Sequence, residues 1–454
     1  MQPIKQNVID KIVENDLCCQ CGVCVAMCPK QVLNMAWSPS GDLTPELSGE
    51  CNGCNVCLSV CPFAEGTVKK QDDSPLEPLR SGFNYDKDLG SYLQTLVAYS
   101  CENDQRENGA SGGMVTWLLE ELINKNIVDA VICVGNGDVA DRLFSYKICF
   151  NHKEVREASG SKYYPVSLEN VLEHVKSHDY RYAVVGLPCR IQGLYRAINK
   201  FPKLKQRINY TIGLTCGHLP NKYYTEYLAN KVGIATNYIQ SINYRQKDQD
   251  RPASNYGFTC RDSNGKYGST IYFSQIGKIW HNGFFQVNAC NFCQDVFAEL
   301  ADVSMMDAWL PEFARDYRGH SLLVVRNHLI LELIKNGSRE NRCVIESVDK
   351  ELVKRSQQGV IFNKTILIKG KAYWALKHGK ALPDNGICPS AKIYKKHRVF
   401  IDNSLTIQQE SKEMWPKYRD GRIKEFDEYF KRYNKWFLLY KLKYYLMRII
   451  GRLS

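Results

Sequence analysis

Residues 18–30, CCQCGVCVAMCPK, place five cysteines within eleven positions and finish the run with Cys-Pro. Residues 51–62, CNGCNVCLSVCP, repeat the pattern with the same intervals between cysteines. Each run fits the spacing C-x2-C-x2-C-x3-C-P, in which three thiols share seven positions and a fourth follows after three intervening residues. Thiols this close together, twice in one chain, indicate a shared inorganic cofactor rather than core packing.

The spacing predicts two 4Fe–4S clusters. Three thiolates on one tight loop bind three irons of a cubane, whereas the fourth cysteine lies further along and serves the other cluster. The expected ligand sets are Cys18, Cys21, Cys24 with Cys61, and Cys51, Cys54, Cys57 with Cys28. Zinc and disulfides are the alternatives, but zinc sites usually combine separate C-x2-C pairs, and disulfides are rare in reducing compartments. Residues 1–65 resemble a two-cluster bacterial-type ferredoxin, a small α+β domain.

The composition is that of an ordinary globular chain of 454 residues, 44% hydrophobic and 24% charged. Because we find neither an apolar spanning run nor a signal peptide, we expect a cytoplasmic protein. In that compartment clustered cysteines more often bind metal or do redox chemistry. The net charge of +12 lies largely in the tail, where seven basic and no acidic residues follow Glu428.

The sequence pattern divides the rest of the chain. Residues 128–135 and 208–216 are strand-like runs that alternate with helical runs, which predicts an α/β domain with a mixed, largely parallel sheet. Two β-rich runs that flank Asn264-Gly265 predict a hairpin. The expected segments are a linker at 66–91, the main domain at 92–336, a peripheral α/β extension at 337–400 and a basic helical tail at 401–454.

Four further cysteines are candidates for a third site. Cys189 and Cys216 each follow a short apolar strand, and ligands of open α/β sheets gather at the carboxyl ends of strands. Cys290 and Cys293 form the pair CNFC. Together the four suffice for one more 4Fe–4S cluster, although on spacing alone core packing is the commoner reason for a cysteine at a strand end.

Two glycine-containing segments are candidates for binding a phosphate or an aromatic ring system. The first precedes the helix expected at 114–126, where free amides and the helix dipole suit a phosphate; an ordinary Ser-Gly helix start is the alternative. The second, GSKYY, offers a cation, a hydroxyl and an aromatic ring; a solvated lysine beside packed tyrosines is the alternative. The residues concerned are Gly109, Ser111, Gly112, Gly113, Gly160, Ser161, Lys162 and Tyr163.

The main domain is similar to the β-subunit family of coenzyme F(420) hydrogenase/dehydrogenase. The resemblance is carried in order by GASGGMVTWLLEELI (109–123), GSKYYPV (160–166), VGLPCRIQGL (185–194), GLTCGH (213–218) and CNFCQDVFAELADVSMMDAW (290–309). It implies an iron–sulfur flavoprotein with FAD at both glycine segments. It also implies that Cys189, Cys216, Cys290 and Cys293 hold a third cluster. It names no catalytic residue.

The resemblance implies an oxidoreductase that moves electrons between 4Fe–4S clusters and FAD, and then to or from a small substrate or the deazaflavin coenzyme F(420). The expected partners are a small-molecule substrate and a redox protein, such as a ferredoxin or a hydrogenase/dehydrogenase subunit; no nucleic-acid fold signature is present. A non-catalytic electron-relay subunit and a reductase of a bacterial surface-polysaccharide pathway are the alternatives. Fold does not select the substrate.

The remaining signals are weaker. Cys19 falls outside the cysteine pattern and is expected to be a small buried residue. His218 and His281 lie near the third cysteine set and are expected to be structural rather than proton donors. Asp302 and Asp307 are expected to be turn or cap residues, or to orient a nearby loop. The basic, aromatic end of the tail either lies on an anionic membrane surface or packs on its own domain.

Overall fold

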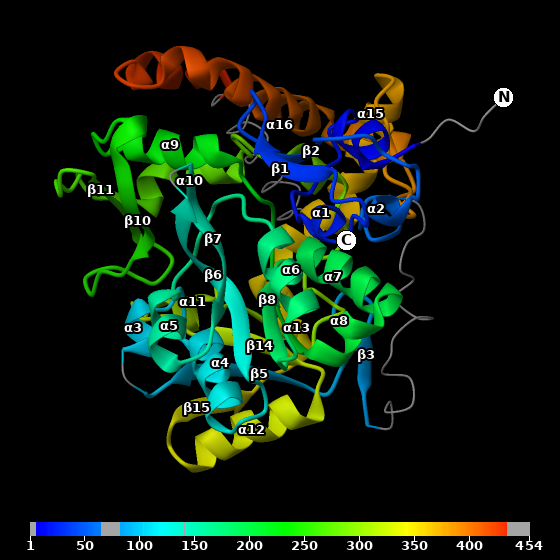
Figure 1. The fold of residues 1–454 in the computed structure, drawn as a ribbon. Coiled ribbons are helices and arrows are strands. Elements are labelled where there is room, and N and C mark those ends of the chain that lie inside the picture. Colours follow the sequence, from blue (N-terminus) through cyan, green and yellow to red (C-terminus); the bar gives the residue numbers. More distant parts are fainter. Residues whose placement is uncertain (1–5, 65–81, 103, 140, 434–454) are drawn as a thin grey trace.

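The computed structural model describes residues 6–64, 82–102, 104–139 and 141–433. An eight-stranded sheet forms the centre of the main domain, with the strand order β15–β5–β14–β13–β9–β8–β6–β7 (Figure 1). Its strands are β5 (Gln94–Ser100), β6 (Ala130–Val139), β7 (Arg142–Cys149), β8 (Tyr182–Gly186), β9 (Ile208–Leu214), β13 (Val303–Asp307), β14 (Ser321–Val325) and β15 (Cys343–Ser347).

The sheet is mixed, and its parallel pairings lie at its centre. Strands β13, β9, β8 and β6 are parallel neighbours, as the alternation of strands and helices predicts. β7 returns antiparallel to β6, and β14, β5 and β15 follow β13 in three antiparallel pairings. The predicted mixed α/β sheet is confirmed. The segment 337–400, expected to be peripheral, contributes β15, an edge strand of this sheet.

Helices cover both faces because the strands are apolar on both sides. On one face, Leu118 and Leu333 pack with Val131 and Val185 of the sheet. On the other face, Leu194 packs in one core with residues of the main sheet whose side chains point away from the first face. The covering helices are α4 (Met114–Asn124) and α12 (His328–Arg339) on the first face, and α6 (Glu169–Ser177), α7 (Pro188–Lys200) and α8 (Pro202–Arg207) on the second.

The N-terminal region repeats one local structure. Gln20 and Gly53 both have positive φ, 66° and 75°, and each donates its amide to the sulfur two residues earlier, at 3.3 and 3.4 Å. Gly22 and Asn55 then begin the two short helices with φ of 71° and 58°. The two cysteine runs therefore fold alike. The elements are η1 (Ile9–Val13), α1 (Val23–Ala26), the antiparallel pair β1 (Leu33–Trp37) and β2 (Leu43–Leu47), and α2 (Val56–Ser59).

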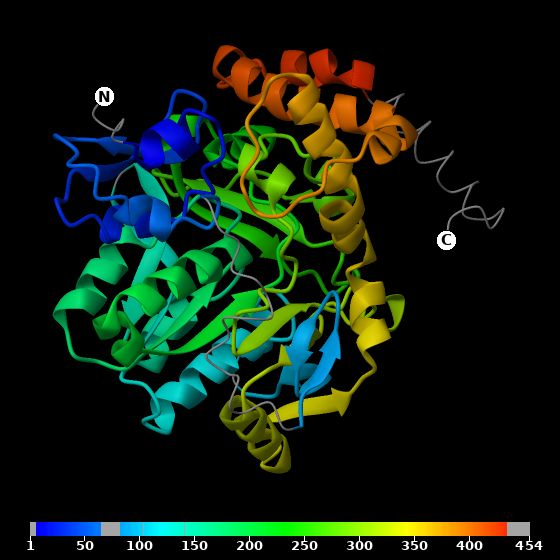
Figure 2. The same ribbon diagram turned by 90° about the vertical axis from the view of Figure 1, so that its right-hand side faces the viewer.

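This region lies against the main domain beside α6 and α7 (Figures 1 and 2). Leu168 donates its amide to the Cys21 carbonyl at 2.8 Å, and Arg142 donates to the Met35 carbonyl at 2.8 Å. A side chain at Gly22 would meet Glu169 Oε2 at 2.7 Å. The first cysteine loop is thus held directly on the main domain.

A second, smaller sheet and the C-terminal helices complete the fold. β10 (Ile239–Gln246), β11 (Gly257–Asp262) and β12 (Ile271–Tyr272) are antiparallel, which confirms the hairpin expected at Asn264-Gly265. α9 (Lys222–Lys231) contacts both β11 and α16. The remaining described helices of the second half are η3 (Thr236–Tyr238), α10 (Phe273–His281), η4 (Asn288–Phe292), α11 (Pro311–Ala314), α13 (Lys350–Ser356), α14 (Gln358–Phe362), η5 (Asn363–Leu367), α15 (Ile368–Lys377) and α16 (Ala391–Tyr418).

The predicted linker and tail are only partly described. Residues 65–81 and 434–454 lie outside the described residues, whereas 84–92 form a small antiparallel pair, β3 (Asn84–Asp86) and β4 (Gly90–Tyr92). The expected tail boundary at 401 falls inside α16. Phe426 and Phe430 pack against Phe284, so the described start of the tail is buried on its own domain. Within the described ranges, no helix is long and apolar enough to cross a membrane.

Candidate functional site

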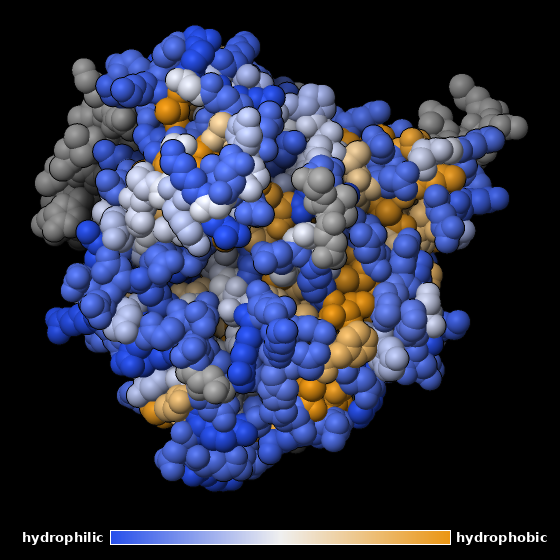
Figure 3. All heavy atoms as spheres, turned by 60° about the vertical axis from the view of Figure 1, so that its left-hand side comes forward, coloured by the Kyte–Doolittle hydropathy of each residue, from blue (hydrophilic) through white to orange (hydrophobic). Residues whose placement is uncertain are grey.

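A cavity of about 740 Å³ lies where β8, β9 and β13 end, between the main sheet and the second sheet. This is the edge of an open α/β sheet where ligands bind, and the volume is in the range of small-molecule sites. On the face drawn in Figure 3, apolar side chains gather in a hollow with a polar rim.

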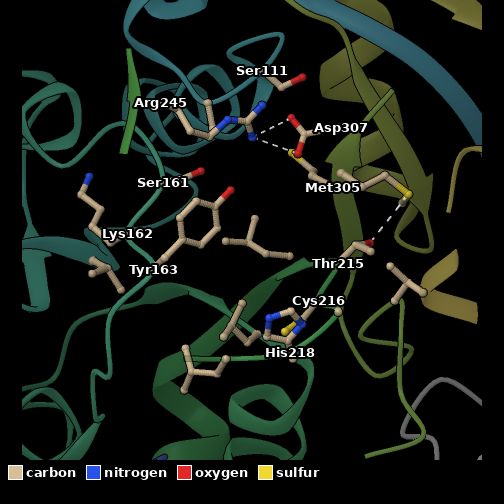
Figure 4. A pocket seen from close by; sticks show the side chains of 18 of the residues that line it. Ser111, Ser161, Lys162, Tyr163, Thr215, Cys216, His218, Arg245, Met305 and Asp307 are labelled. Atoms are coloured by element: carbon tan, nitrogen blue, oxygen red, sulfur yellow. Dashed lines mark hydrogen bonds and ion pairs between the residues drawn. The ribbon is translucent and has the colours of Figure 1, made fainter. Parts of the chain in front are cut away.

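Both glycine-containing segments line this cavity. Gly109, Ser111 and Gly113 do so from the loop before α4, and residues 160–163 do so beside that loop, since a Cβ on Gly160 would meet the Asn108 carbonyl at 3.5 Å (Figure 4). Gly112 instead faces the sheet, because a Cβ there would meet the Ala98 carbonyl at 2.6 Å. The structure therefore brings together two segments that are about 50 residues apart in the chain.

The loop before α4 is held by backbone contacts. Ser111 donates its hydroxyl to the His320 carbonyl at 2.5 Å and does not cap the helix. The first residue before α4 is Gly113, with a φ of 78°, and no side chain caps the amides of the first turn. Lys247 donates to the carbonyls of Ser111, at 2.9 Å, and Arg318, at 2.6 Å. The uncapped amides beside the cavity suit an anionic group.

Lys162 lines the cavity, and its ammonium is held by nearby backbone carbonyls. Its ammonium donates to the carbonyls of Ala158 at 2.6 Å and Gly160 at 3.1 Å, and also to Ser159. These carbonyls follow α5 (His152–Glu157). Burial lowers the pKa of Lys162 to about 8. All three ammonium donors are thus engaged with the protein, and Ser161 and Tyr163 line the cavity beside it (Figure 4).

The structure gathers the third cysteine set from three distant parts of the chain. Cys216 and Cys290 line the cavity, and Cys189, Cys216, Cys290 and Cys293 lie close enough to influence one another's ionisation. The Leu219 amide donates to the Cys290 sulfur at 3.3 Å. A hydrogen bond from Cys19, aided by Arg190 and opposed by burial, lowers the pKa of Cys189 to about 5.

Buried cations surround this third set. Arg190 donates to the Cys189 sulfur at 2.9 Å, and Lys364 donates to the Cys293 sulfur at 3.3 Å. Lys371 is also buried and donates to Asn291 at 2.8 Å. Buried cations need nearby negative charge. Four thiolates around an iron–sulfur cubane supply such charge, so the residues present fit a cluster at this position.

The cysteines of the N-terminal region lie in two groups. Burial, and then the neighbouring thiols of Cys21, Cys18 and Cys61, raise the pKa of Cys24. The second set surrounds a small cavity near the surface, lined by Cys28, Cys51, Cys54 and Cys57. Cys28 is thus placed with the later run and Cys61 with the earlier one. Within the described ranges, no group of three or more His, Cys, Asp or Glu side chains is arranged to hold a single metal ion.

Other predicted residues are structural neighbours of the site. His218 lines the cavity and lies 4.2 Å from Trp280 between ring centroids, and burial lowers its pKa to about 3. Asp302 is half-buried and accepts hydrogen bonds from the Thr211 amide and hydroxyl, as a structural carboxylate does. Asp307 lines the cavity, where it pairs with Arg245.

The sequence interpretation missed several cavity residues. It did not name the buried basic residues Arg190, Arg245, Lys364 and Lys371. Single basic residues in helices and strands form no recognisable motif. It also missed Cys133, whose sulfur lies 3.8 Å from that of Cys149. Cys19 is buried as expected, but it contacts Cys189 and Cys21 and so lies between two cysteine sets.

Two family models match the chain in succession. The N-terminal part of the coenzyme F(420) hydrogenase/dehydrogenase beta subunit matches residues 95–173, and the C-terminal part matches residues 179–351. Together they span more than half of the chain. The chain belongs to the coenzyme F(420) hydrogenase/dehydrogenase beta-subunit family. Residues 1–94 lie outside both matches, so the ferredoxin-like interpretation of the N-terminal region depends on its cysteine spacing and local structure.

Curated relatives of this family have several activities. The coenzyme F(420)-dependent sulfite reductase of Methanocaldococcus jannaschii is 26% identical over 362 residues, 75% of this chain and 49% of that protein. This chain therefore spans about half of that relative. A component of the F(420)H(2) dehydrogenase of Methanosarcina mazei is 22% identical over 72% of this chain and 88% of its own length. The chloroplastic 7-hydroxymethyl chlorophyll a reductase of Oryza sativa is 28% identical over 39% of each chain.

A solved structure supports the fold. A chain of the F(420)-reducing [NiFe] hydrogenase complex from Methanosarcina barkeri superimposes with a TM-score of 0.50 at 17% identity. The match covers 66% of this chain and 99% of that chain. At this identity the likeness is one of fold. The chain thus combines membership of the beta-subunit family with the α/β fold of this solved structure.

Proposed function

We propose that the chain is an iron–sulfur flavoprotein oxidoreductase that binds three 4Fe–4S clusters and FAD. The observation that carries the proposal is the shared cavity: two glycine segments and the sulfurs of Cys216 and Cys290 line one space. The three cysteine sets supply the twelve ligands of three cubanes: Cys18, Cys21, Cys24 and Cys61; Cys28, Cys51, Cys54 and Cys57; and Cys189, Cys216, Cys290 and Cys293.

The chain's own residues bind and orient the cofactors. The uncapped amides before α4, with Gly109 and Gly113, would hold the FAD pyrophosphate, and Ser161 and Tyr163 of the neighbouring segment would contact the flavin. When bound, the clusters would supply one-electron transfer, and FAD would exchange electrons singly or in pairs. Arg190 and Lys364 keep negative charge on the third sulfur set, and the surrounding apolar core excludes water.

The electron acceptor or donor would be a small substrate or coenzyme F(420) at the same cavity. Sequence relatives of known activity include F(420)-dependent enzymes and a chlorophyll-derivative reductase. All of these names describe redox reactions, which supports the proposal. The substrate differs within the family. Cys54 is the exposed cysteine of the second set. A ferredoxin-like redox partner would therefore meet the chain at that end.

A non-catalytic relay subunit is the second candidate. It is favoured by two relatives whose names describe parts of larger assemblies, the dehydrogenase component of M. mazei and the hydrogenase complex of M. barkeri. In that case the chain would pass electrons between subunits and would turn over no substrate alone.

A reduction assay separates the two candidates. The full-length protein, purified without oxygen, is reduced by a dithionite-reduced ferredoxin and offered coenzyme F(420) or a benzoquinone. The enzyme proposal predicts catalytic reduction of an acceptor by the isolated chain. Bleaching of cluster and flavin absorption with no turnover until a co-purifying partner is added would indicate the relay. A protein with neither absorption would overturn both.

A further inference from the structure

Arg190 lies between the first and the third cysteine sets. It is the second residue after Pro188 in α7 and only 1% exposed. One end of its guanidinium donates to the Cys189 sulfur at 2.9 Å. The other end donates to the Val166 carbonyl at 3.1 Å and to the Gln20 carbonyl at 3.3 Å. Gln20 precedes Cys21, so one side chain contacts both the third set and the loop of the first.

No carboxylate balances this charge in the described part of the chain. The groups that raise the pKa of Arg190 against the effect of burial are Cys189, Cys19, Tyr146 and Cys21, in that order. A fully buried guanidinium without an acidic partner is strongly unfavourable unless another anion is present. Sulfur ligands and a negatively charged cluster are the anions that this site offers.

Three buried cations lie around the third set. Lys364 donates to the Cys293 sulfur at 3.3 Å and to the Asp295 carbonyl at 2.7 Å, and Lys371 donates to Asn291 at 2.8 Å. Asp295 is the buried carboxylate nearest to Lys364, and its Oδ2 accepts a hydrogen bond from Gln192. Three cations therefore face four thiols and one carboxylate.

We propose that Arg190 is a shared positioning residue that raises the reduction potential of the third cluster and fixes the Gln20 loop against Cys189. The inference deepens the proposed function and rests on it. A fixed positive charge stabilises the reduced cluster, which carries one more negative charge, and burial strengthens the effect. Because the guanidinium donates to a sulfur of the third set and to a backbone carbonyl of the first, it raises the potential of the third cluster more.

Lys364 acts on the same cluster through a different sulfur. It donates to a sulfur of the third set and to the Asp295 carbonyl, both within the main domain. The two cations thus share the electrostatic role, whereas the link to the ferredoxin-like loop belongs to Arg190. The two residues can be separated by experiment.

The test is an EPR-monitored redox titration of the full-length protein and its variants. R190Q and K364Q are each expected to shift the midpoint of the third cluster to a lower potential. R190K keeps the positive charge and is therefore expected to have a midpoint potential close to that of the wild type. R190Q is expected, in addition, to weaken the magnetic interaction between the third cluster and its neighbour in the doubly reduced protein, which K364Q leaves intact.

R142Q is the matched control. Arg142 also joins the two regions, by donating to the Met35 carbonyl, but it has a carboxylate partner, Glu169 at 2.7 Å, and its hydrogen bonds reach no cysteine. R142Q is expected to leave all cluster midpoints unchanged. A shift in R142Q equal to that of R190Q would show a general effect of loosened packing and would overturn the inference.

The outcomes distinguish this inference from the proposed function. If the wild-type protein contains fewer than three clusters, the proposed function fails. If it contains three and R190Q and K364Q titrate like wild type, this inference alone fails. If R190Q assembles no third cluster, R190K decides: a cluster with the wild-type midpoint supports a charge role, and a missing cluster contradicts it.

Discussion

Arg245 and Asp307 form a two-pronged ion pair in the cavity wall, with Nη1 of the arginine 2.9 and 3.0 Å from the two carboxylate oxygens (Figure 4). Arg245 is buried on β10 and lies over the rings of Tyr256 and Trp309. Asp307 ends β13. The pair therefore joins the second sheet to the main sheet beside the candidate flavin site.

Removing the carboxylate is expected to destabilise the protein. D307A leaves the Arg245 guanidinium buried and unpaired, which should lower the free energy of unfolding by about 3 kcal/mol. The double variant R245M/D307L removes both charges and should lose less. Urea denaturation of the three proteins measures this order. Equal losses in the single and double variants would show that the pair is not the source of the effect.

Lys247 predicts a pH dependence of stability. Burial, followed by the charge of Arg245, lowers its pKa from 10.5 to about 7. Between these values the unfolded chain binds more protons than the folded chain, so the free energy of unfolding rises with pH. From pH 7 to pH 9 the wild type should gain about 2 kcal/mol relative to K247M. An identical rise in K247M would contradict this assignment.

Gly112 tests the loop before α4. A Cβ there would meet the Ala98 carbonyl at 2.6 Å and the Ser321 amide at 2.7 Å, both backbone atoms of neighbouring strands. We expect G112A to lose about 2–3 kcal/mol of stability and to purify with less flavin. The control for stability is G359A, where the added methyl meets nothing within 4 Å. A G112A protein with wild-type stability and flavin would contradict the described loop geometry.

The crossed cysteines predict which cluster each variant loses. Cys28 lies with the Cys51 run, so C28S should remove the second cluster and lower the iron content from about twelve to about eight per chain. C61S should instead remove the first cluster. EPR spectra of the two variants identify the surviving signals. C388S, at an exposed cysteine, is the control. Loss of the same cluster in both variants would contradict the crossed arrangement.

Local patterns in the sequence predicted local structure well. The intervals between cysteines predicted two loops with the same local fold. The conformation of a few successive residues determines which sulfurs can come close together, so the spacing alone carries this information. The alternation of strands and helices foretold the parallel strands β6, β8, β9 and β13. It did not predict the antiparallel edge that includes β15, because the pairing of an edge strand depends on contacts between residues distant in the sequence.

Long-range contacts explain what the sequence left unknown. Lys162 carries no local sign that its ammonium caps the carbonyls after α5. Arg190 and Lys364 are separated by more than 170 positions in the sequence, and only the fold brings both to the third cysteine set. The effect of their charges depends on the sulfurs that surround them. A single sequence does not reveal that these groups are close together.

Metal, sulfide and flavin analysis of the full-length protein, purified without oxygen, tests the central claim most directly. Three cubanes and one FAD predict about twelve irons and about twelve acid-labile sulfides per chain, with one flavin. Mössbauer spectra should then show only 4Fe–4S signals. About eight irons with no flavin would limit the redox chemistry to the N-terminal region, and bound zinc in place of iron would contradict the account altogether.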